Sequence, residues 1–315
     1  MKVTRGYLGG IVRPHPVATI GNFDGHHLGH RALLERVVKA ARESRGTALA
    51  LTFDPHPVKI LAPQIDLRFL TSPDEKLARF EEAGIDEVVL LEFSEAFAAL
   101  SPEAFAEQVL ARGLGLKELF VGQHFAFGHK RTGTLADLQT FGRRLGFAVH
   151  PLNPVVVEGG VVSSTRIRQL IQQRDVRQAA RLLGRQYAIS GIVSKGSQRG
   201  QTLGWPTANL QLPPERVIPS DGVYAAVTVV DGRRHDSVAY IGTRPTFDAG
   251  QRLLEVYLLE GEHELYGRSI TVEFIQSVRG DMQFADGEAL SRQIAVDVDC
   301  AKDMLHQHHA MVIES

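Results

Sequence analysis

Apolar runs alternate with amphipathic helical segments through the first half of the chain, and this alternation constrains the fold more than any other sequence feature. The apolar runs lie at 17–23, 47–53, 86–93 and 118–122. Helical periodicity follows them at 28–44, 71–84, 101–113 and 134–146. Strands that alternate with helices predict a parallel sheet, covered on both faces by helices in right-handed crossovers.

One of these helices carries clear signals at both ends. Ser72, Pro73 and Glu75 have the pattern of an N-cap, a first helical residue and a capping-box partner. Gly84 follows the last periodic residues and is expected to end the helix. The segment is therefore predicted as a helix with defined boundaries.

The second half of the chain has a different sequence pattern, with short runs rich in Val, Ile and Tyr. Strands are predicted at 187–194, 222–230, 236–242, 252–260 and 269–278. Asp231 and Gly232 have the composition of a hairpin turn, and a closing helix is predicted from Gly287 to about Gln307. We expect a small β-barrel or sandwich here. The change from alternating strands and helices to short strands predicts two domains, 1–184 and 185–315.

Charge and cysteine content limit the possible partners and the cellular location of the protein. The 315 residues include 35 basic and 36 acidic side chains, so no overall field attracts nucleic acid or an acidic membrane surface. No apolar run approaches the roughly 18 residues of a membrane span. Cys300 is the single cysteine, and the N-terminus lacks a secretory signal. We expect a cytoplasmic protein that binds neither nucleic acid nor membrane, and nothing in the sequence indicates an oligomer.

The stretch GNFDGHHLGH, Gly21 to His30, joins the first predicted strand to the first predicted helix. In an open α/β sheet this is a ligand-binding crevice, where a helix N-terminus offers N–H groups and positive partial charge to an anion. Gly21, Gly25 and Gly29 allow the backbone to approach a bulky ligand closely. His27 and His30, three residues apart, can face one phosphate. The favoured ligand is therefore phosphate.

A metal site is the alternative for these histidines. It would need a third ligand, which His124, Asp54 or His56 would supply after folding. Glycines are unnecessary to a zinc site and useful to a nucleotide site, so phosphate remains the preferred interpretation. Taken alone, the H-x-G-H pattern is also compatible with turn residues near a surface.

A second predicted helix start supports the phosphate interpretation. The segment VVSSTRIRQLI contains Ser163, Ser164 and Thr165, followed by Arg166 and Arg168. Hydroxyl, backbone N–H and guanidinium donors together suit a triphosphate. The simpler alternative is an ordinary N-cap with solvated arginines.

The run KGSQRGQTLGWPTANLQLP, 195–213, has no simple structural explanation, because a strand would avoid its proline and glycines. Gly196, Arg199 and Gly200 belong to a basic loop whose N–H groups suit phosphates. The Thr207 hydroxyl and the Asn209 carbonyl are hard oxygen ligands of the kind that Mg²⁺ accepts.

These motifs together resemble those of a known family. H-x-G-H with a later Ser/Thr-rich motif is similar to nucleotidyltransferases, and G-W-P-T-A-N resembles the G-x-P-T-A-N of riboflavin kinases. Nearly the whole chain resembles the bacterial bifunctional riboflavin kinases and FMN adenylyltransferases, also called FAD synthetases. Further matching motifs are T-F-D-P-H-P at 52–57, V-G-Q-H-F-A-F-G at 121–128, G-V-Y at 222–224, I-G-T-R-P-T-F at 241–247, L-E-V at 254–256 and L-Y-G at 265–267.

The resemblance implies a Rossmann-like nucleotidyltransferase domain with a parallel sheet, followed by a riboflavin-kinase-type β-barrel with a closing helix. The barrel would phosphorylate riboflavin to FMN. The first domain would join FMN to the AMP portion of ATP and release pyrophosphate, with no covalent enzyme intermediate. ATP is then the co-substrate, FMN and FAD are the products, and Mg²⁺ is expected to bridge the phosphates.

The resemblance also implies roles for individual residues. His27 and His30 would hold the ATP phosphates and the developing charge, and Glu255 would orient or deprotonate the riboflavin hydroxyl. The residues expected to bind ATP or its phosphates are Gly21, Asn22, Phe23, Gly29, Ser164, Thr165, Arg166, Arg168, Gly196, Arg199, Gly200, Thr207 and Asn209. The residues expected at the flavin are His124, Phe125, Arg279 and Phe284. Thr207 and Asn209 are also the expected metal ligands.

A few positions depart from the family's pattern. His124 stands where Asp or Asn is usual, His26 where a small apolar residue is usual, and Asp281 where glutamate is usual. Two alternatives therefore remain: a riboflavin kinase whose α/β half adenylylates poorly, and a flavin-sensing regulator without catalysis. A metal-dependent hydrolase would leave G-W-P-T-A-N unexplained.

Overall fold

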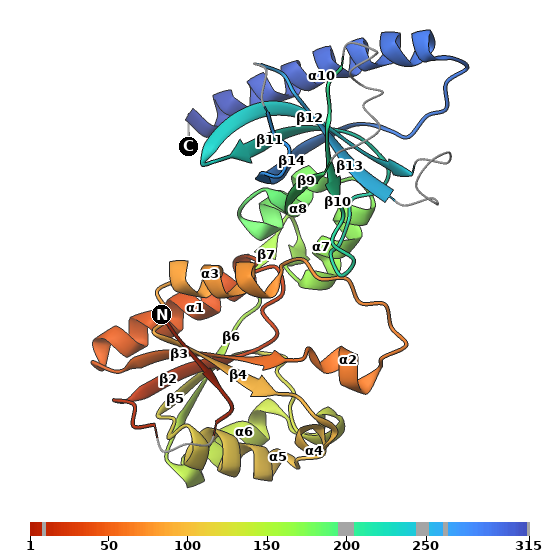
Figure 1. The fold of residues 1–315 in the computed structure, drawn as a ribbon. Coiled ribbons are helices and arrows are strands. Elements are labelled where there is room, and N and C mark those ends of the chain that lie inside the picture. The colour runs from red at the N-terminus through yellow and green to blue at the C-terminus, as the bar shows by residue number, and fades with distance from the viewer. Residues whose placement is uncertain (8–10, 195–204, 244–251, 261–263, 314–315) are drawn as a thin grey trace. The chain divides into compact units, whose positions relative to one another are not determined.

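The computed structural model describes residues 1–7, 11–194, 205–243, 252–260 and 264–313. The chain forms two compact units, Met1–Ser164 and Thr165–Ser315, drawn as a ribbon in Figure 1. Gly196, Arg199 and Gly200, expected in a phosphate loop, lie outside the described residues. The sequence predicts that the two activities belong to residues 1–184 and 185–315. These functional boundaries stay a prediction, because the compact units describe packing and not activity.

A six-stranded sheet in the order β1-β4-β3-β2-β5-β6 forms the centre of the first unit. Its strands are β1 (Lys2–Arg5), β2 (Pro16–Ile20), β3 (Thr47–Asp54), β4 (Glu87–Glu92), β5 (Glu118–Gly122) and β6 (Ala148–Leu152), and a small hairpin of β7 (Val156–Val157) and β8 (Gly160–Val161) follows them. All pairings in the large sheet are parallel, as predicted. Because β3 and β5 lie on opposite sides of β2, the strand order reverses there, which is where ligands bind in such folds.

Helices cover both faces of this sheet. They are α1 (Leu28–Glu43), α2 (Pro57–Leu61), α3 (Pro73–Glu82), α4 (Glu95–Ala98), α5 (Pro102–Ala104), the π-helical η1 (Phe105–Gly113), the short η2 (His129–Arg131) and α6 (Leu135–Leu145). Alternate residues of β3 face opposite sides. Ala48 and Ala50 pack with α1 and α3, whereas Leu49 and Leu51 pack with η1 and α6. The helix predicted at 101–113 is therefore present, but most of it is π-helical.

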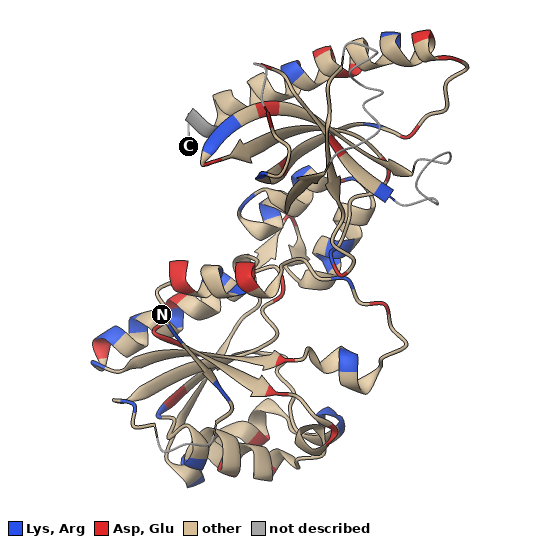
Figure 2. Cartoon of the chain, viewed as in Figure 1, with Lys and Arg blue, Asp and Glu red and all other residues tan. Residues whose placement is uncertain are grey.

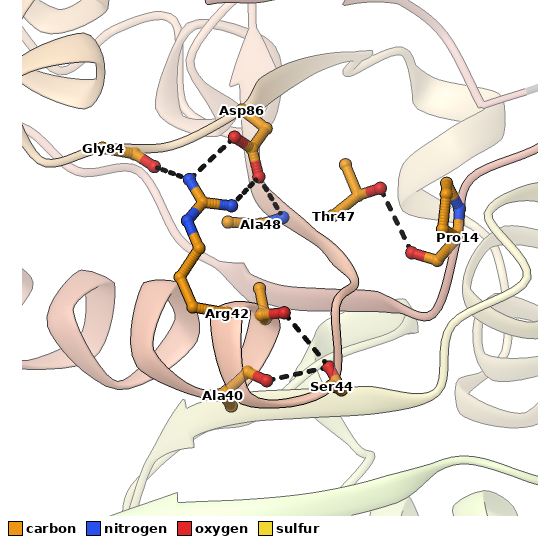
Figure 3. A network of polar contacts seen from close by, with 9 residues as sticks. Pro14, Ala40, Arg42, Ser44, Thr47, Ala48, Gly84 and Asp86 are labelled. Carbon is orange, nitrogen blue, oxygen red and sulfur yellow. Dashed lines mark hydrogen bonds and ion pairs between the residues drawn. The ribbon is translucent and has the colours of Figure 1, made fainter.

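Figure 3 shows how the C-terminal end of α1 is tied to the neighbouring strands. Arg42 donates hydrogen bonds to Asp86 at 2.7 and 2.8 Å and to the Gly84 carbonyl at 3.2 Å. Asp86 also accepts a hydrogen bond from the Ala48 N–H at 2.8 Å. The hydrogen bond from Arg42 holds the pKa of Asp86 below its usual value. Because this end of α1 is anchored, the opposite end has a set position beside β2.

The second unit contains a closed barrel with strand order β10-β13-β12-β11-β14-β9. Its strands are β9 (Tyr187–Ser194), β10 (Ala208–Gln211), β11 (Gly222–Val230), β12 (Arg233–Thr243), β13 (Arg252–Leu258) and β14 (Ser269–Gly280). The helices α7 (Ser164–Gln172) and α8 (Val176–Leu183) precede it, and α10 (Gly287–Ile313) follows it. Its strand pairings are antiparallel. Of the two predicted architectures, the barrel is therefore the one found.

The predicted turn and closing helix are both present. Asp231 and Gly232 join β11 to β12 with φ of 48° and 78°, as a two-residue hairpin turn requires. The helix α10 buries Val298, Ala301 and Leu305 against β11, β12 and β14. It continues beyond the end predicted near 307. The predicted fold class, a parallel α/β domain followed by a barrel with a closing helix, is confirmed.

Candidate active sites

The loop between β2 and α1 has an unusual backbone. Phe23 and His26 have φ of 51° and 43°, which few residues other than glycine adopt. Contacts with Phe80 hold this conformation, because the Phe23 ring centroid lies 5.2 Å from the Phe80 ring and the His26 ring lies 4.5 Å from it. Phe23 and His26 are both buried. The loop is therefore a packed structure, and the interpretation as turn residues at a surface is wrong.

Asp24, within the same loop, joins it to the start of α3. Its buried carboxylate accepts hydrogen bonds from the Leu70 N–H at 2.9 Å, the Thr71 N–H at 3.1 Å and the Thr71 hydroxyl at 3.2 Å. The Thr71 hydroxyl in turn accepts the Gly25 N–H at 3.2 Å. Sequence reasoning did not assign a role to Asp24, although it lies inside the predicted motif. Its contacts make it the anchor of the loop.

His27 is the N-cap of α1. Its Nδ1 atom accepts a hydrogen bond from the His30 N–H at 3.3 Å. A neutral imidazole that accepts at Nδ1 carries its proton at Nε2. The rings of His27 and His30 are stacked, with centroids 3.6 Å apart and an interplanar angle of 16°. The two histidines of the H-x-G-H motif thus form one unit at the helix start.

His30 is held in its neutral form. Burial lowers its pKa well below the usual value, and the neighbouring His27, His26 and Lys76 lower it further. Its Nδ1 atom is buried and finds no hydrogen-bond partner among the residues that the structure describes. His30 therefore supplies polar atoms but little positive charge near neutral pH.

The N-terminus of α1 is open to an anion. Its first turn contains no acidic side chain that would neutralise the helix dipole. A side-chain carbon at Gly29 would lie 3.2 Å from the His27 ring and 3.8 Å from the carbonyl oxygen of Val162. Glycine at this position therefore leaves space between the histidine and the segment that precedes α7.

The two phosphate motifs meet at that segment. The Ser164 hydroxyl donates a hydrogen bond to the Asp24 carbonyl at 2.8 Å, across 140 residues of sequence. This contact places Ser164, the first residue of α7, beside the first motif. Thr165, Arg166 and Arg168 are the following residues of the same helix, and their approach to a triphosphate stays a prediction.

The other residues expected near this site lie on exposed segments. Asn22 and His124 are exposed, and His124 follows β5, the neighbour of β2. The Phe125 ring is parallel to that of Phe127, with centroids 5.7 Å apart and an interplanar angle of 13°. Contact between these residues and FMN or nucleotide stays a prediction.

The residues of the metal interpretation have other contacts. Asp54 forms an ion pair with Arg5 at 2.9 Å. His56 is the N-cap of α2 and accepts the Val58 N–H at its Nδ1 atom, at 3.2 Å. Within the described ranges, no three His, Cys, Asp or Glu side chains gather as they would around a metal ion. The geometry therefore favours the phosphate interpretation.

In the barrel, Glu255 lies at the centre of a row across three strands. It faces Asn209 of β10 on one side and Tyr240 of β12 on the other. Directly opposite residues of antiparallel strands point to the same face. The Thr207 hydroxyl lies 3.5 Å from a Glu255 carboxylate oxygen. The structure thus brings together Thr207, Asn209 and Glu255, which the sequence separates by almost fifty residues.

Tyr240 is a member of this row that sequence reasoning missed. Its hydroxyl donates a hydrogen bond to Asp281 at 2.9 Å. Burial raises the pKa of Tyr240, as do the hydrogen bond to Asp281 and the nearby carboxylates of Asp281 and Glu255. A side-chain carbon at Gly242 would lie 2.1 Å from this hydroxyl. Gly242, within the I-G-T-R-P-T-F motif, therefore makes room for the tyrosine, and Asp281 serves as its acceptor.

Arg279, expected at the flavin, is held by the closing helix. Its guanidinium donates to both carboxylate oxygens of Asp297, at 2.9 and 2.7 Å. The two side chains are only 16% and 4% exposed, so the pair is buried. The guanidinium carbon lies 5.6 Å from the centroid of the Phe284 ring. Asp297 was not predicted because α10 has no local motif around it; a direct contact of Arg279 or Phe284 with flavin stays a prediction.

Two family models match the chain. One, described as FAD synthetase, matches residues 12–166, and the other, described as riboflavin kinase, matches residues 183–305. The chain is 40% identical to a bifunctional riboflavin kinase/FMN adenylyltransferase of Pseudomonas fluorescens over 293 residues, covering 91% of this chain and 92% of that protein. It is 39% identical to the protein of the same description from Escherichia coli over 289 residues, with the same coverages.

A solved structure also resembles the whole chain. It is a protein of Streptococcus pneumoniae described as a macrolide-efflux protein, with a TM-score of 0.87 and 29% sequence identity. The similarity covers 96% of this chain and 99% of that one. Among the described helices of the present chain, none has the length and apolar character needed to cross a membrane.

Proposed function

Because the chain belongs to the family of bifunctional riboflavin kinases/FMN adenylyltransferases, we propose that it carries out both reactions of that family. Its barrel phosphorylates riboflavin to FMN, and its α/β unit adenylylates FMN to FAD. The observation that carries this proposal is the presence of two separate constellations in one chain. One is the H-x-G-H loop joined to Ser164 through Asp24. The other is Glu255 with Thr207 and Asn209.

In the α/β unit, a phosphate oxygen of FMN attacks the α-phosphorus of ATP. The new P–O bond forms as the bond between the α-phosphorus and the bridging oxygen breaks, and pyrophosphate leaves with that electron pair. The α1 N-terminus and the His27 Nε2–H donate to phosphate oxygens. The set loop geometry favours catalysis by positioning, because no side chain has to form a covalent bond.

In the barrel, the 5′-hydroxyl of riboflavin attacks the γ-phosphorus of ATP, and ADP leaves. Glu255 accepts the hydroxyl proton as the new P–O bond forms. The row of Asn209, Glu255 and Tyr240 supports this role, because it places Glu255 between polar residues of both neighbouring strands, with the Thr207 hydroxyl 3.5 Å from its carboxylate. Tyr240, held by Asp281, is a positioning residue for Glu255.

Mg²⁺ fits the oxygen atoms of the barrel site. The Thr207 hydroxyl and the Asn209 side-chain carbonyl are hard ligands, and the nearby Glu255 carboxylate adds negative charge. When bound, the ion would neutralise charge on the phosphates of ATP. This set favours Mg²⁺ over zinc, because it contains neither histidine nor cysteine.

The proposal also covers the domain boundaries, the cellular location and the partners. We place the adenylyltransferase domain at 1–184 and the kinase domain at 185–315. We propose a cytoplasmic location, which the single, exposed cysteine Cys300 supports. Nucleic acid is not proposed as a partner, because basic and acidic side chains are interspersed on both units (Figure 2).

A time course tests this function. The pure full-length protein is incubated with riboflavin, ATP and Mg²⁺, and the flavins are separated by chromatography, with ADP and pyrophosphate measured in parallel. We expect FMN to appear first with ADP, and FAD to follow with pyrophosphate. If FMN accumulates and no FAD forms even from supplied FMN, the α/β unit is not an adenylyltransferase. If riboflavin is unchanged, the kinase assignment is wrong.

A further inference from the structure

Lys76 is a residue of α3 that neither the H-x-G-H loop nor the segment 163–168 contains. Lys76 lies four residues before Phe80, so both side chains lie on the same face of α3. Phe80 packs against Phe23 and His26 of the H-x-G-H loop. The face of α3 that carries Lys76 therefore faces this loop.

The position of α3 relative to the loop is set at two places. The Asp24 carboxylate accepts both N–H groups of Leu70 and Thr71 just before the helix. A complete capping box between Ser72 and Glu75 then starts the helix. Lys76 follows directly, so its backbone cannot move independently of the loop. This arrangement presents the lysine as a fixed part of the site.

The Lys76 ammonium lies in a partly buried, polar environment. It is within electrostatic reach of the carboxylates of Asp24 and Asp54 and of the His30 ring. Burial lowers the pKa of Lys76, and the two carboxylates oppose that shift. An anionic ligand complements a cation held at this position.

The H-x-G-H loop, Gly21 to His30, contains no lysine or arginine. His30 is neutral because of its lowered pKa, and His27 accepts a hydrogen bond at Nδ1. The α1 N-terminus contributes only a partial charge. A triphosphate carries several negative charges, so a full cation beside the histidines is the complement that the loop needs.

We propose that Lys76 is a catalytic residue of the adenylyltransferase site, where its ammonium binds the β- and γ-phosphates of ATP and stabilises the departing pyrophosphate. This rests on the proposed adenylyl transfer. As the bond from the α-phosphorus to the bridging oxygen breaks, that oxygen takes the electron pair and its negative charge rises. Lys76 stabilises this charge without giving up or accepting a proton. It makes no contact with the phosphate of FMN.

The test compares Lys76→Met and Lys76→Arg in the full-length protein with Arg79→Met as a matched control. Arg79 lies on the same helix and forms an ion pair with Glu82. FAD formation from supplied FMN is measured over a range of ATP and of FMN concentrations. For Lys76→Met we expect kcat/KM for ATP to fall about 30- to 100-fold, with the KM for FMN within about twofold. Lys76→Arg restores much of the loss, and Arg79→Met behaves as the wild type.

A binding measurement separates this role from a structural one. Pyrophosphate with Mg²⁺ is titrated into each variant by calorimetry, and we expect weaker binding in Lys76→Met alone. The proposal is overturned if Lys76→Met keeps its kcat/KM for ATP. It is also overturned if pyrophosphate binding is unchanged, or if FMN and ATP parameters fall together without recovery in Lys76→Arg. A wild type that forms no FAD would instead contradict the proposed function itself.

Discussion

The two sites of this protein handle charge in opposite ways. The α/β site is built from the stacked rings of His27 and His30, a helix N-terminus and backbone N–H groups, with Asp24 anchoring the loop. The barrel site is built from charged and polar side chains already in contact, such as Arg279 with Asp297 and Tyr240 with Asp281. In the proposed function, the first arrangement binds a polyanion, whereas the carboxylate of Glu255 in the second accepts a proton. We therefore expect substitutions in the two sites to affect different activities and to change stability by different amounts.

The largest effect is expected for Glu255→Gln. The amide keeps the shape of the side chain but cannot accept the hydroxyl proton, so FMN formation should fall about a thousandfold. FAD formation from supplied FMN should be unchanged, because the α/β site does not use this residue. Both rates are measured by chromatography of the flavins. A kinase rate within tenfold of the wild type would remove Glu255 from the proposed mechanism.

A smaller effect of the opposite selectivity is expected for His27→Asn. The asparagine oxygen can still cap α1, but the ring donor and the stack on His30 are lost. We expect FAD formation to fall about a hundredfold, with FMN formation and the free energy of unfolding little changed. A loss of both activities would mean that the substitution unfolds the protein and that the histidine has no specific role.

A matched pair of substitutions compares the two buried aspartates. Asp297→Asn leaves the Arg279 guanidinium without its counter-charge, so we expect the barrel to lose about 3 kcal/mol of unfolding free energy. Asp24→Asn keeps one carbonyl acceptor for the backbone N–H groups, so we expect a loss of about 1 kcal/mol in the α/β unit.

Urea unfolding measures both effects. The single tryptophan, Trp205, packs on Tyr257 and reports the barrel, while circular dichroism reports both units. A larger loss of unfolding free energy for Asp24→Asn than for Asp297→Asn would contradict the proposed difference between the two sites.

The smallest effect concerns pH. The folded state holds His30 neutral, with its pKa well below the usual value. In the unfolded chain it takes up a proton near pH 6.5. The unfolded state therefore binds more protons below that pH, and stability falls as pH decreases towards the lowered pKa of His30, by up to about 1.4 kcal/mol per pH unit. Between neutral pH and pH 5, the free energy of unfolding should depend less on pH for His30→Gln than for the wild type. Identical slopes would contradict the neutral state.

Much of the first unit was predictable because its signals are local. The apolar runs and the capping residues around Ser72 directly predict the parallel sheet and α3. The π-helical segment at 105–113 was not, because a π-helix and an α-helix have similar apolar periodicity over so short a length. In the barrel, the sequence left a choice between barrel and sandwich, because strand composition does not reveal whether a sheet closes.

The sites show the same division. The roles of His27, His30 and Glu255 are predictions from their motifs and from the family resemblance. Asp297 and Tyr240 were not, because each acts through a partner on another element, and no spacing in the sequence records that distance. Lys76 was also missed, since a lysine in a helix is usually solvated. Only the packing of α3 on the loop gives it a different environment.

The sequence by itself determined where strands and helices form, that the chain has two halves, and which chemical groups are available for phosphate and flavin. Those properties depend on interactions between residues near one another along the chain. The tertiary structure decided which groups meet: Ser164 with Asp24, Thr207 with Glu255, and Arg279 with Asp297. It also decided their charge state, as the buried His30 illustrates. Contact and desolvation depend on which surfaces pack together, so neither property exists until the chain has folded.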